Sequence, residues 1–213
     1  FKVRQKVNTM HKKLEFHIKG VSPLMMHNGR TLTNPLHPLT KVIKTFSGKR
    51  TKTEEDHLAM SKLEWVGGLY LSERPEIDVD GFNIHIGKSG DIIIPGEVIE
   101  AVLREGAKKN KLGTAFKAGV SVLDDFVLGH EGNGNLEDMW ESGLFTDIRN
   151  VKIQKAAIMR TRPIFRNWEL QFEVLYLPSV VDPDQIREAL NIAGHVVGLC
   201  DYRPKHGRFM IVE

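Results

Sequence analysis

The chain has 213 residues, of which 41% are hydrophobic and 27% charged, so it can bury a core and is not globally disordered. Its single cysteine, Cys200, excludes an internal disulfide and a cysteine-rich zinc site, and no apolar run is long enough to cross a membrane. We therefore expect an intracellular, cytoplasmic protein. The sequence begins at Phe1 rather than Met and shows no signal peptide, so we expect the native N-terminus to be missing.

The net charge of +3 hides an uneven distribution of charge along the chain. Residues 1–62 hold 13 Lys and Arg against four acidic residues, whereas residues 118–148 hold seven acidic residues and neither Lys nor Arg. A basic half beside an acidic segment indicates either a surface that binds a polyanion or an ordinary solvated face. Charge alone does not separate these alternatives.

In chain order, the first half mixes strands and helices. Residues 14–20 alternate apolar and polar side chains, which predicts a half-buried strand. Residues 28–53 predict an extended excursion with one short helix around 39–46, because prolines and glycine interrupt the stretch. Residues 54–66 predict a helix with acidic residues in its first turn, where they suit the helix dipole. Residues 69–94 predict short strands and a hairpin.

A sharp turn in the middle of the chain launches a helix. The short apolar strand at 92–94 stops at Pro95-Gly96, and a helix is predicted over 97–109. Its apolar residues follow helical spacing: Val98, Ile99, Val102 and Leu103. The lysines at its end suit the negative end of the helix dipole, so they indicate either ordinary helix chemistry or an anion-binding surface.

The second half alternates strands with helical segments. The expected elements are strands over 119–128, about 151–161 and 168–177, an acidic glycine-rich loop over 129–147 with a helical turn at 136–140, a helix from Pro183, and a last strand over 208–212. Strand-helix-strand units of this kind predict an α+β fold, in which helices cover one face of a sheet and leave the other free to bind a ligand.

Known catalytic motifs are missing from the sequence. The nine histidines form no HExxH, and there is no GxxxxGK[ST], no GxGxxG after a strand and no GxSxG. Cys200 lies beside the end of a buried helix, so we interpret it as a packing residue rather than a nucleophile. We expect no catalytic residue, no metal and no cofactor.

Arginines interleaved with aromatic residues are the remaining signal. Arg160 and Arg162 alternate on one predicted strand, so both guanidinium groups emerge on the same face. Guanidinium groups match phosphate oxygens, and aromatic rings stack on bases. The pattern favours binding of single-stranded nucleic acid. The alternative is that Trp168 and Phe209 belong to the core and the arginines are ordinary surface residues.

Three segments, in the expected order, resemble the repeat-associated mysterious protein (RAMP) superfamily. Residues 92–104, IIIPGEVIEAVLR, are similar to its strand, Pro-Gly turn and helix, although Glu97 and Glu100 depart from the family pattern. Residues 17–29, HIKGVSPLMMHNG, resemble its first strand and the turn that follows. Residues 198–213, GLCDYRPKHGRFMIVE, resemble its Gly-rich loop and last strand.

The resemblance implies an antiparallel sheet like that of the RNA-recognition motif and of ferredoxin, with helices on one face. It implies a single domain over 1–213 with insertions at about 28–66 and 67–92, and the acidic loop at 129–147 in addition. The closest members are backbone subunits of CRISPR effector complexes, which form a helical filament along guide RNA. The implied partners are single-stranded RNA or DNA, copies of the chain itself and other subunits of a CRISPR-like complex, in antiviral defence. A stand-alone relative, such as a phage protein, is the alternative.

Two departures from the family bear on activity. Members that cut RNA carry an aspartate after the first strand, whereas no aspartate precedes Asp56 here, so we expect binding without cleavage. His27 follows the first strand and leaves open a metal-independent endoribonuclease. A third alternative is a protein-interaction module, such as a mimic or inhibitor of a CRISPR subunit. Nothing in the sequence separates RNA from DNA as the ligand.

The candidate contacts with nucleic acid are basic and aromatic residues from separate parts of the chain. Head-to-tail assembly would join basic residues 1–62 of one copy to acidic residues 124–147 of the next. The candidate binding residues are Arg30, Lys41, Lys44, Lys49, Arg50, Lys52, Arg104, Lys108, Lys109, Lys111, Arg160, Arg162, Arg166, Trp168, Tyr202, Arg203, Lys205, His206 and Arg208.

Overall fold

The computed structural model describes residues 10–153 and 156–212, and it confirms an α+β protein with antiparallel strand pairs. These residues divide into two compact units. Unit 1 is built from 10–22, 94–128 and 169–212, and unit 2 from 23–93 and 129–168 without 154–155. The three segments expected as insertions, 28–66, 67–92 and 129–147, all belong to unit 2.

The sheet of unit 1 is antiparallel at its centre. The long strand β1 pairs with β10 on one side and with β11 on the other, both antiparallel. The strand order is β11-β1-β10-β7-β5, with β6 also pairing with β10. The strands are β1 (Lys12–Gly20), β5 (Ile93–Ile94), β6 (Val120–Ser121), β7 (Phe126–His130), β10 (Trp168–Tyr176) and β11 (Phe209–Val212).

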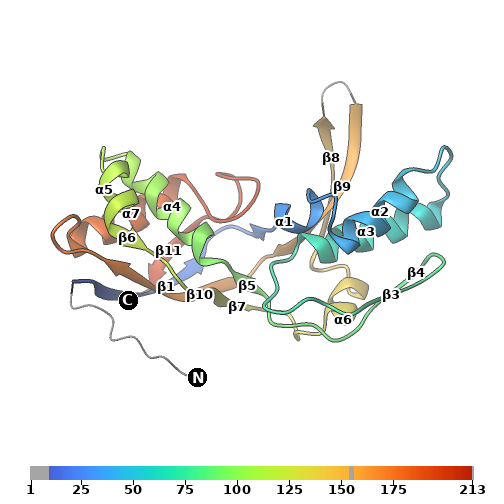
Figure 1. Ribbon diagram of the computed structural model, residues 1–213, viewed down its shortest axis with the longest axis horizontal. Coiled ribbons are helices and arrows are strands. Elements are labelled where there is room, and N and C mark those ends of the chain that lie inside the picture. The colour runs from blue at the N-terminus through green and yellow to red at the C-terminus, as the bar shows by residue number, and fades with distance from the viewer. Residues whose placement is uncertain (1–9, 154–155, 213) are drawn as a thin grey trace. The chain divides into compact units, whose positions relative to one another are not determined.

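Helices cover one face of this sheet (Figure 1). They are α4 (Gly96–Lys108), α5 (Gly113–Gly119) and α7 (Pro183–Val196). Alternate residues of the central strands form the core beneath them, as the rings of Phe16 and Phe172 show with centroids 5.6 Å apart. Helix α7 begins where the sequence predicts, because Asp182 and Gln185 form a reciprocal capping box.

The helices α4 and α7 pack very closely against each other. At their contact, a Cβ added to Gly106 would overlap the carbonyl oxygen of Ala189 and also meet the side chain of Ala193. Small residues therefore let the two backbones approach. This approach sets the position of the last turn of α4 relative to the segment that follows α7.

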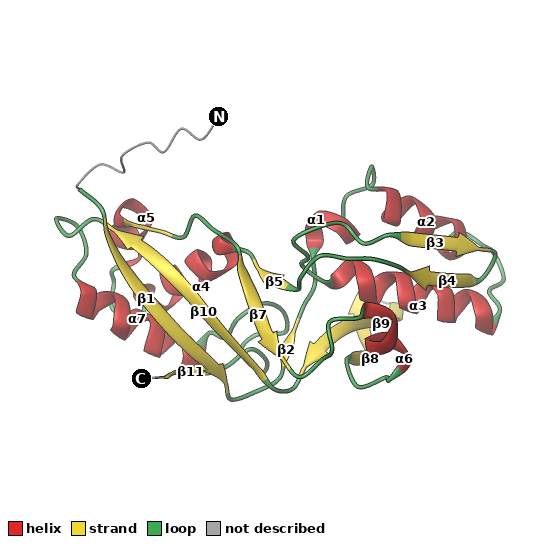
Figure 2. Ribbon diagram, turned by 90° about the horizontal axis from the view of Figure 1, so that it is seen from below, coloured by secondary structure: helices red, strands yellow, loops and turns green. Residues whose placement is uncertain are grey.

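Unit 2 combines helices with a twisted ribbon and a separate hairpin (Figures 1 and 2). A three-stranded sheet has the order β2-β9-β8, and β3 pairs with β4. The elements are β2 (Leu24–Met25), α1 (Gly29–Leu32), α2 (Pro38–Ser47), α3 (Glu54–Gly68), β3 (Ile77–Asp80), β4 (Asn83–Ile86), α6 (Leu136–Glu141), β8 (Thr146–Ile153) and β9 (Ala156–Phe165).

Two buried charges on α3 connect it to the rest of unit 2. Lys62 forms an ion pair with Glu137 of α6, and Glu137 also accepts a hydrogen bond of 2.8 Å from the backbone N–H of Ile86 in β4. Glu64 forms an ion pair with Arg160 and accepts a hydrogen bond of 3.1 Å from the N–H of Thr161, both in β9. The helix thus joins α6, β4 and β9 through paired charges.

Two strand predictions are wrong in detail. The single strand expected at about 151–161 is divided between β8 and β9, which pair antiparallel. The sequence between them has neither Gly nor Pro, so it carries no turn signal. The strand expected over 119–128 is interrupted between β6 and β7. The sequence reading also missed α5, which is too short to establish a helical period.

We predict that Gly106→Ala destabilises the protein by about 1–3 kcal/mol, because the added methyl group meets backbone that cannot move aside. Chemical denaturation measures the change. Gly29→Ala is the matched control, since a Cβ there would lie 3.7 Å from its nearest neighbour, and we expect it to be neutral or slightly stabilising. Equal effects of the two substitutions would contradict the close approach of α4 and α7.

The charge network of unit 2 predicts a pH dependence. Burial alone would raise the pKa of Glu137, but hydrogen bonds from Lys62 and Ile86 outweigh it and hold the pKa below its ordinary value of 4.5. The carboxylate therefore contributes stability above pH 4.5, and this is lost as pH falls through the lowered pKa.

Glu137→Gln removes the charge that Lys62 needs, so we expect it to be less stable than the wild type at pH 7. The difference should shrink in urea titrations as the pH is lowered below 4.5. The control is Glu141→Gln, which changes an exposed acid on the same helix. A difference that stays constant with pH would show that the Glu137 charge does not stabilise the fold.

Candidate nucleic-acid interface

A basic hollow lies at the end of α4 in unit 1. Its volume is about 560 Å³, and it is open to solvent. Four cations line it together with Gly113 and Thr114; they are Arg104, Lys108, Lys111 and Lys117. The hollow thus gathers positive charge from two helices and the turn between them.

Helical periodicity explains the arrangement on α4. Its buried residues include Val102 and Leu103, which face the core, and the next positions along the outer surface carry cations. Arg104 and Lys108 stand one turn apart on the same face. Lys111 adopts a left-handed φ of 63°, a conformation that costs a side-chain-bearing residue on the order of 1 kcal/mol, and the chain turns there from α4 into α5.

The electrostatic environment of Glu105 shows that a second segment reaches this cluster. The hydrogen bond from Lys108 holds the pKa of Glu105 below its usual range, and the charges of Lys108, Arg104 and Arg203 act in the same direction. Arg203 lies on the loop that follows α7. Two of the regions that the sequence singles out, the end of α4 and this loop, therefore come together.

Close backbone contacts hold the loop after α7 at its base. The N–H of Leu199 donates a 2.7 Å hydrogen bond to the carbonyl of Gly207, and a Cβ on Gly207 would overlap the Leu199 carbonyl oxygen. Gly207 also has a φ of 73°, which favours glycine. We name residues 198–208 the glycine-necked loop.

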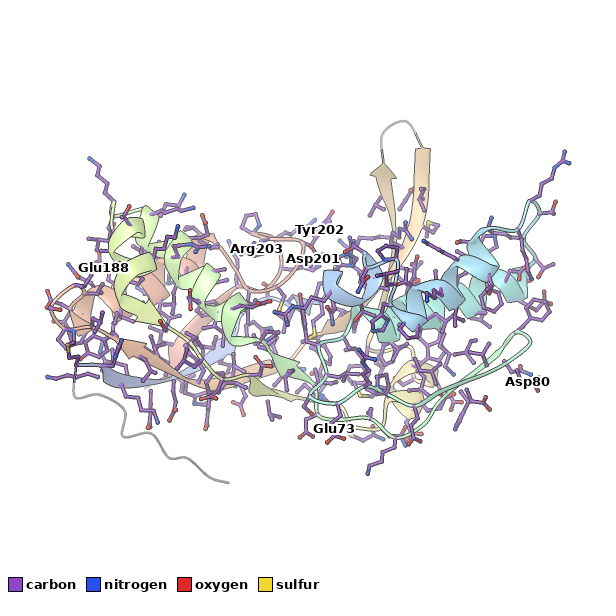
Figure 3. The ribbon with its side chains drawn as sticks, in the orientation of Figure 1. Glu73, Asp80, Glu188, Asp201, Tyr202 and Arg203 are labelled. Atoms are coloured by element: carbon purple, nitrogen blue, oxygen red, sulfur yellow. The ribbon has the colours of Figure 1, made fainter. Side chains whose placement is uncertain are left out.

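The glycine-necked loop presents an aromatic ring beside its cations. Tyr202 is 42% exposed, and its ring centroid lies 5.3 Å from that of His206. Figure 3 shows Asp201, Tyr202 and Arg203 on the arch of the loop. Lys205 and Arg208 are also exposed on this loop, and the backbone of Arg208 accepts hydrogen bonds from Val21 and Ser22 after β1.

Cys200 belongs to the same loop but has no reactive thiol. Burial raises the pKa of Cys200 to about 12. The thiol therefore stays protonated at neutral pH and is a poor nucleophile. This agrees with the packing role that the sequence predicts for it.

The arginines of β8 and β9 share a face but are engaged within unit 2. Cross-strand register places Arg149 opposite Arg160 and Arg162 opposite Asp147, which confirms that Arg160 and Arg162 share a face. Arg160 pairs with Glu64, and Arg149 pairs with Asp147. A phosphate would have to compete with these carboxylates.

Other candidates in unit 2 also have structural roles. Arg166 donates to the carbonyl of Leu144. Lys49 pairs with Asp56, and its ammonium lies 4.7 Å from the centroid of the Phe82 ring. The exposed cations of the α1–α3 region are Arg30, Lys41, Lys44, Arg50 and Lys52, with Lys52 donating a 2.9 Å hydrogen bond to the carbonyl of Lys49.

Trp168 requires a correction. It is only 3% exposed, so its ring cannot stack on a base in this conformation. It occupies the buried face of β10 together with Leu170 and Phe172. The alternative interpretation of Trp168 and Phe209 as core residues is confirmed, since Phe209 is also buried.

The open face of the unit 1 sheet is not a basic surface (Figure 2). Its polar residues form cross-strand pairs, Lys13 with Glu173 and His17 with Glu169. Glu15 stands directly opposite Glu173. Acidic groups balance the cations here, so a polyanion would gain little from this face.

Several acids of the segment 124–147 are also occupied within unit 2. Glu131 accepts hydrogen bonds from the N–H groups of Arg166 and Asn167. Asp138 accepts a hydrogen bond of 2.8 Å from the Asn133 amide, and Glu137 pairs with Lys62. Lys2, Arg4 and Lys6 of the basic half lie outside the described residues.

Lys117 is the cation of the basic hollow that sequence reasoning missed. Residues 112–118 were assigned to no element, so Lys117 had no expected place in the fold. Its signal is the helical stretch after Gly113, which returns a lysine to the face of α4. His27, the candidate for cleavage chemistry, lies after β2 in unit 2, where its carbonyl accepts a 3.2 Å hydrogen bond from the Tyr70 hydroxyl.

Within the described part of the chain, no group of three or more His, Cys, Asp or Glu side chains is placed to hold a metal ion. In the same residues, no helix has the length and apolar character needed to cross a membrane. The sequence matches no protein-family model and no curated protein. The resemblance to the RAMP superfamily thus stays a prediction.

Proposed function

We propose that the chain binds single-stranded nucleic acid without cleaving it, and that copies assemble head to tail along the strand. The observation that carries the proposal is the clustering of cations at the end of α4, on α5 and on the glycine-necked loop, beside the exposed ring of Tyr202. Cations neutralise successive phosphates, and an exposed ring offers a platform for a base.

We further propose that unit 1 has the fold of the RNA-recognition motif and ferredoxin. Support comes from the element order β1-α4-β7-β10-α7-β11, which is the strand-helix-strand pattern repeated with a strand pair at its centre. The antiparallel pairing of β1 with both β10 and β11 agrees with this order. The glycine-necked loop would then correspond to the Gly-rich loop of the RAMP superfamily.

The chemistry of the basic hollow favours binding over catalysis. Among the described residues that line it, there is neither a histidine nor a carboxylate to act as a general base near neutral pH. The lining offers lysine ammonium groups, which act on phosphate as point charges, and one guanidinium. We therefore expect recognition of the backbone with little sequence preference.

Assembly along the strand is the second part of the proposal. A head-to-tail contact uses different surfaces on the two copies and builds an open helix. Glu131, Glu137 and Asp138 already have partners within their own chain. Exposed acids such as Asp124 and Glu141 are better suited to meet the cations of a neighbouring copy.

Binding should fall steeply with salt. In fluorescence anisotropy with a labelled single-stranded oligonucleotide, we predict that Lys111→Gln with Lys117→Gln reduces the magnitude of the slope of log K against log salt by about 1.4, since each lost phosphate contact on a single strand contributes about 0.7. The matched control, Lys12→Gln with Lys19→Gln, changes two exposed lysines of β1 and should leave the slope unchanged. Equal effects of the two pairs would contradict a site at the basic hollow.

The same oligonucleotides distinguish the competing functions. Sedimentation with strands of increasing length should show the number of bound copies rising with strand length, and a constant single copy would contradict assembly. Defined cuts in RNA in the presence of EDTA, lost in His27→Ala, would indicate an endoribonuclease instead. No binding to RNA or DNA at low salt would indicate a protein-interaction module.

A further inference from the structure

A cavity in unit 2 lies apart from every residue of the basic hollow. Its volume is about 500 Å³, which falls in the usual range for small-molecule sites. The walls come from α1, α2, the end of α3 and the segment leading into β3. Aliphatic side chains form much of the lining, with Leu39, Val66 and Leu69 buried.

Positive charge borders this aliphatic cavity. Arg30 and Arg74 line it together with one acid, Glu73, which leaves a net positive charge among these three residues. His37 also lines it, and burial, together with the charge of Arg74, lowers the pKa of His37. The effect of Arg74 on His37 shows that the guanidinium lies near this wall. The imidazole is therefore neutral near pH 7.

The neutral ring of His37 has a defined tautomer. Its Nδ1 accepts a 3.3 Å hydrogen bond from the N–H of Leu39 at the start of α2, so the ring proton is on Nε2. An N–H donor and a guanidinium on the same wall both suit an anionic head group.

Asn28 adds an independent sign of an incomplete wall. Its Nδ2 donates a 3.0 Å hydrogen bond to the carbonyl of Leu69, which fixes the orientation of the amide. Its Oδ1 is buried and has no hydrogen-bond partner. A buried acceptor without a partner is rare in folded proteins, and a missing water or ligand is one of its ordinary explanations.

We propose that this cavity binds a small organic anion with an aliphatic body and a single carboxylate head. The aliphatic walls contact the chain of the ligand, and Arg74 and His37 face its head. Among the described residues of the lining, no Phe, Tyr or Trp is present, so the cavity favours an aliphatic body over a stacked base. This site is separate from the proposed nucleic-acid site, and either one can fail without the other.

Methyl-labelled NMR on the full chain tests the proposal, with octanoate as the probe. We expect saturable shifts at the methyl groups of Leu39, Val66 and Leu69 at octanoate concentrations of about 1 mM or below. Arg74→Gln should weaken binding by about tenfold, as the loss of one ion pair at the mouth of a pocket predicts. Arg50→Gln, an exposed arginine of unit 2 outside the lining, should have no effect.

Three further results would overturn the proposal. Shifts that do not saturate, or that move methyl groups throughout both units alike, would show that octanoate does not occupy the cavity. Octanol binding as tightly as octanoate would show that the anionic head is not recognised. Adenosine monophosphate shifting the same methyl groups at lower concentration than octanoate would assign the cavity to a nucleotide instead.

Discussion

The close approach of α4 and α7 at Gly106 is the constraint on which the candidate interface depends. With no side chain at Gly106, the backbone of α4 lies against the Ala189 carbonyl. That distance sets where the last turn of α4 ends and where the glycine-necked loop begins. Arg104, Lys108 and Arg203 act on Glu105 together only because these two helices are held this close. A small residue far from any ligand thus positions the cations.

Unit 2 solves a different problem with buried charge. Lys62 and Glu64 lie two residues apart on α3 and have opposite partners, Glu137 and Arg160. Removing four charged groups from water is expensive, and their mutual pairing mainly offsets that cost. What the pairs add is specificity, since each fixes a different element against the same helix. Arg160 is therefore part of the scaffold of unit 2.

Local patterns in the sequence predicted much of the fold. The helices α2, α3, α4 and α7 follow from apolar periodicity and from their starting residues, and β10 follows from strict alternation. The same alternation already put Trp168 on the side of Leu170 and Phe172, so the sequence held the evidence that its ring is buried. The aromatic signal was given more weight than the periodicity.

Long-range pairing could not be predicted in this way. The partner of Arg160 is 96 residues away, and no local pattern connects a strand arginine to a helix glutamate at that separation. The split between β8 and β9 also escaped prediction, because its sequence carries no turn residue. For the basic hollow, the cations of α4 were predicted, but Lys117 depended on a helix too short to recognise.

Photo-crosslinking tests the proposed interface most directly. A single-stranded oligonucleotide carrying 4-thiouridine would be irradiated with the protein, and the crosslinked peptides identified by mass spectrometry. Crosslinks should fall within residues 104–117 and on the glycine-necked loop, with Tyr202 among the modified residues. Crosslinks confined to the paired polar face of β1 and β10 would contradict a site built from the end of α4, α5 and this loop.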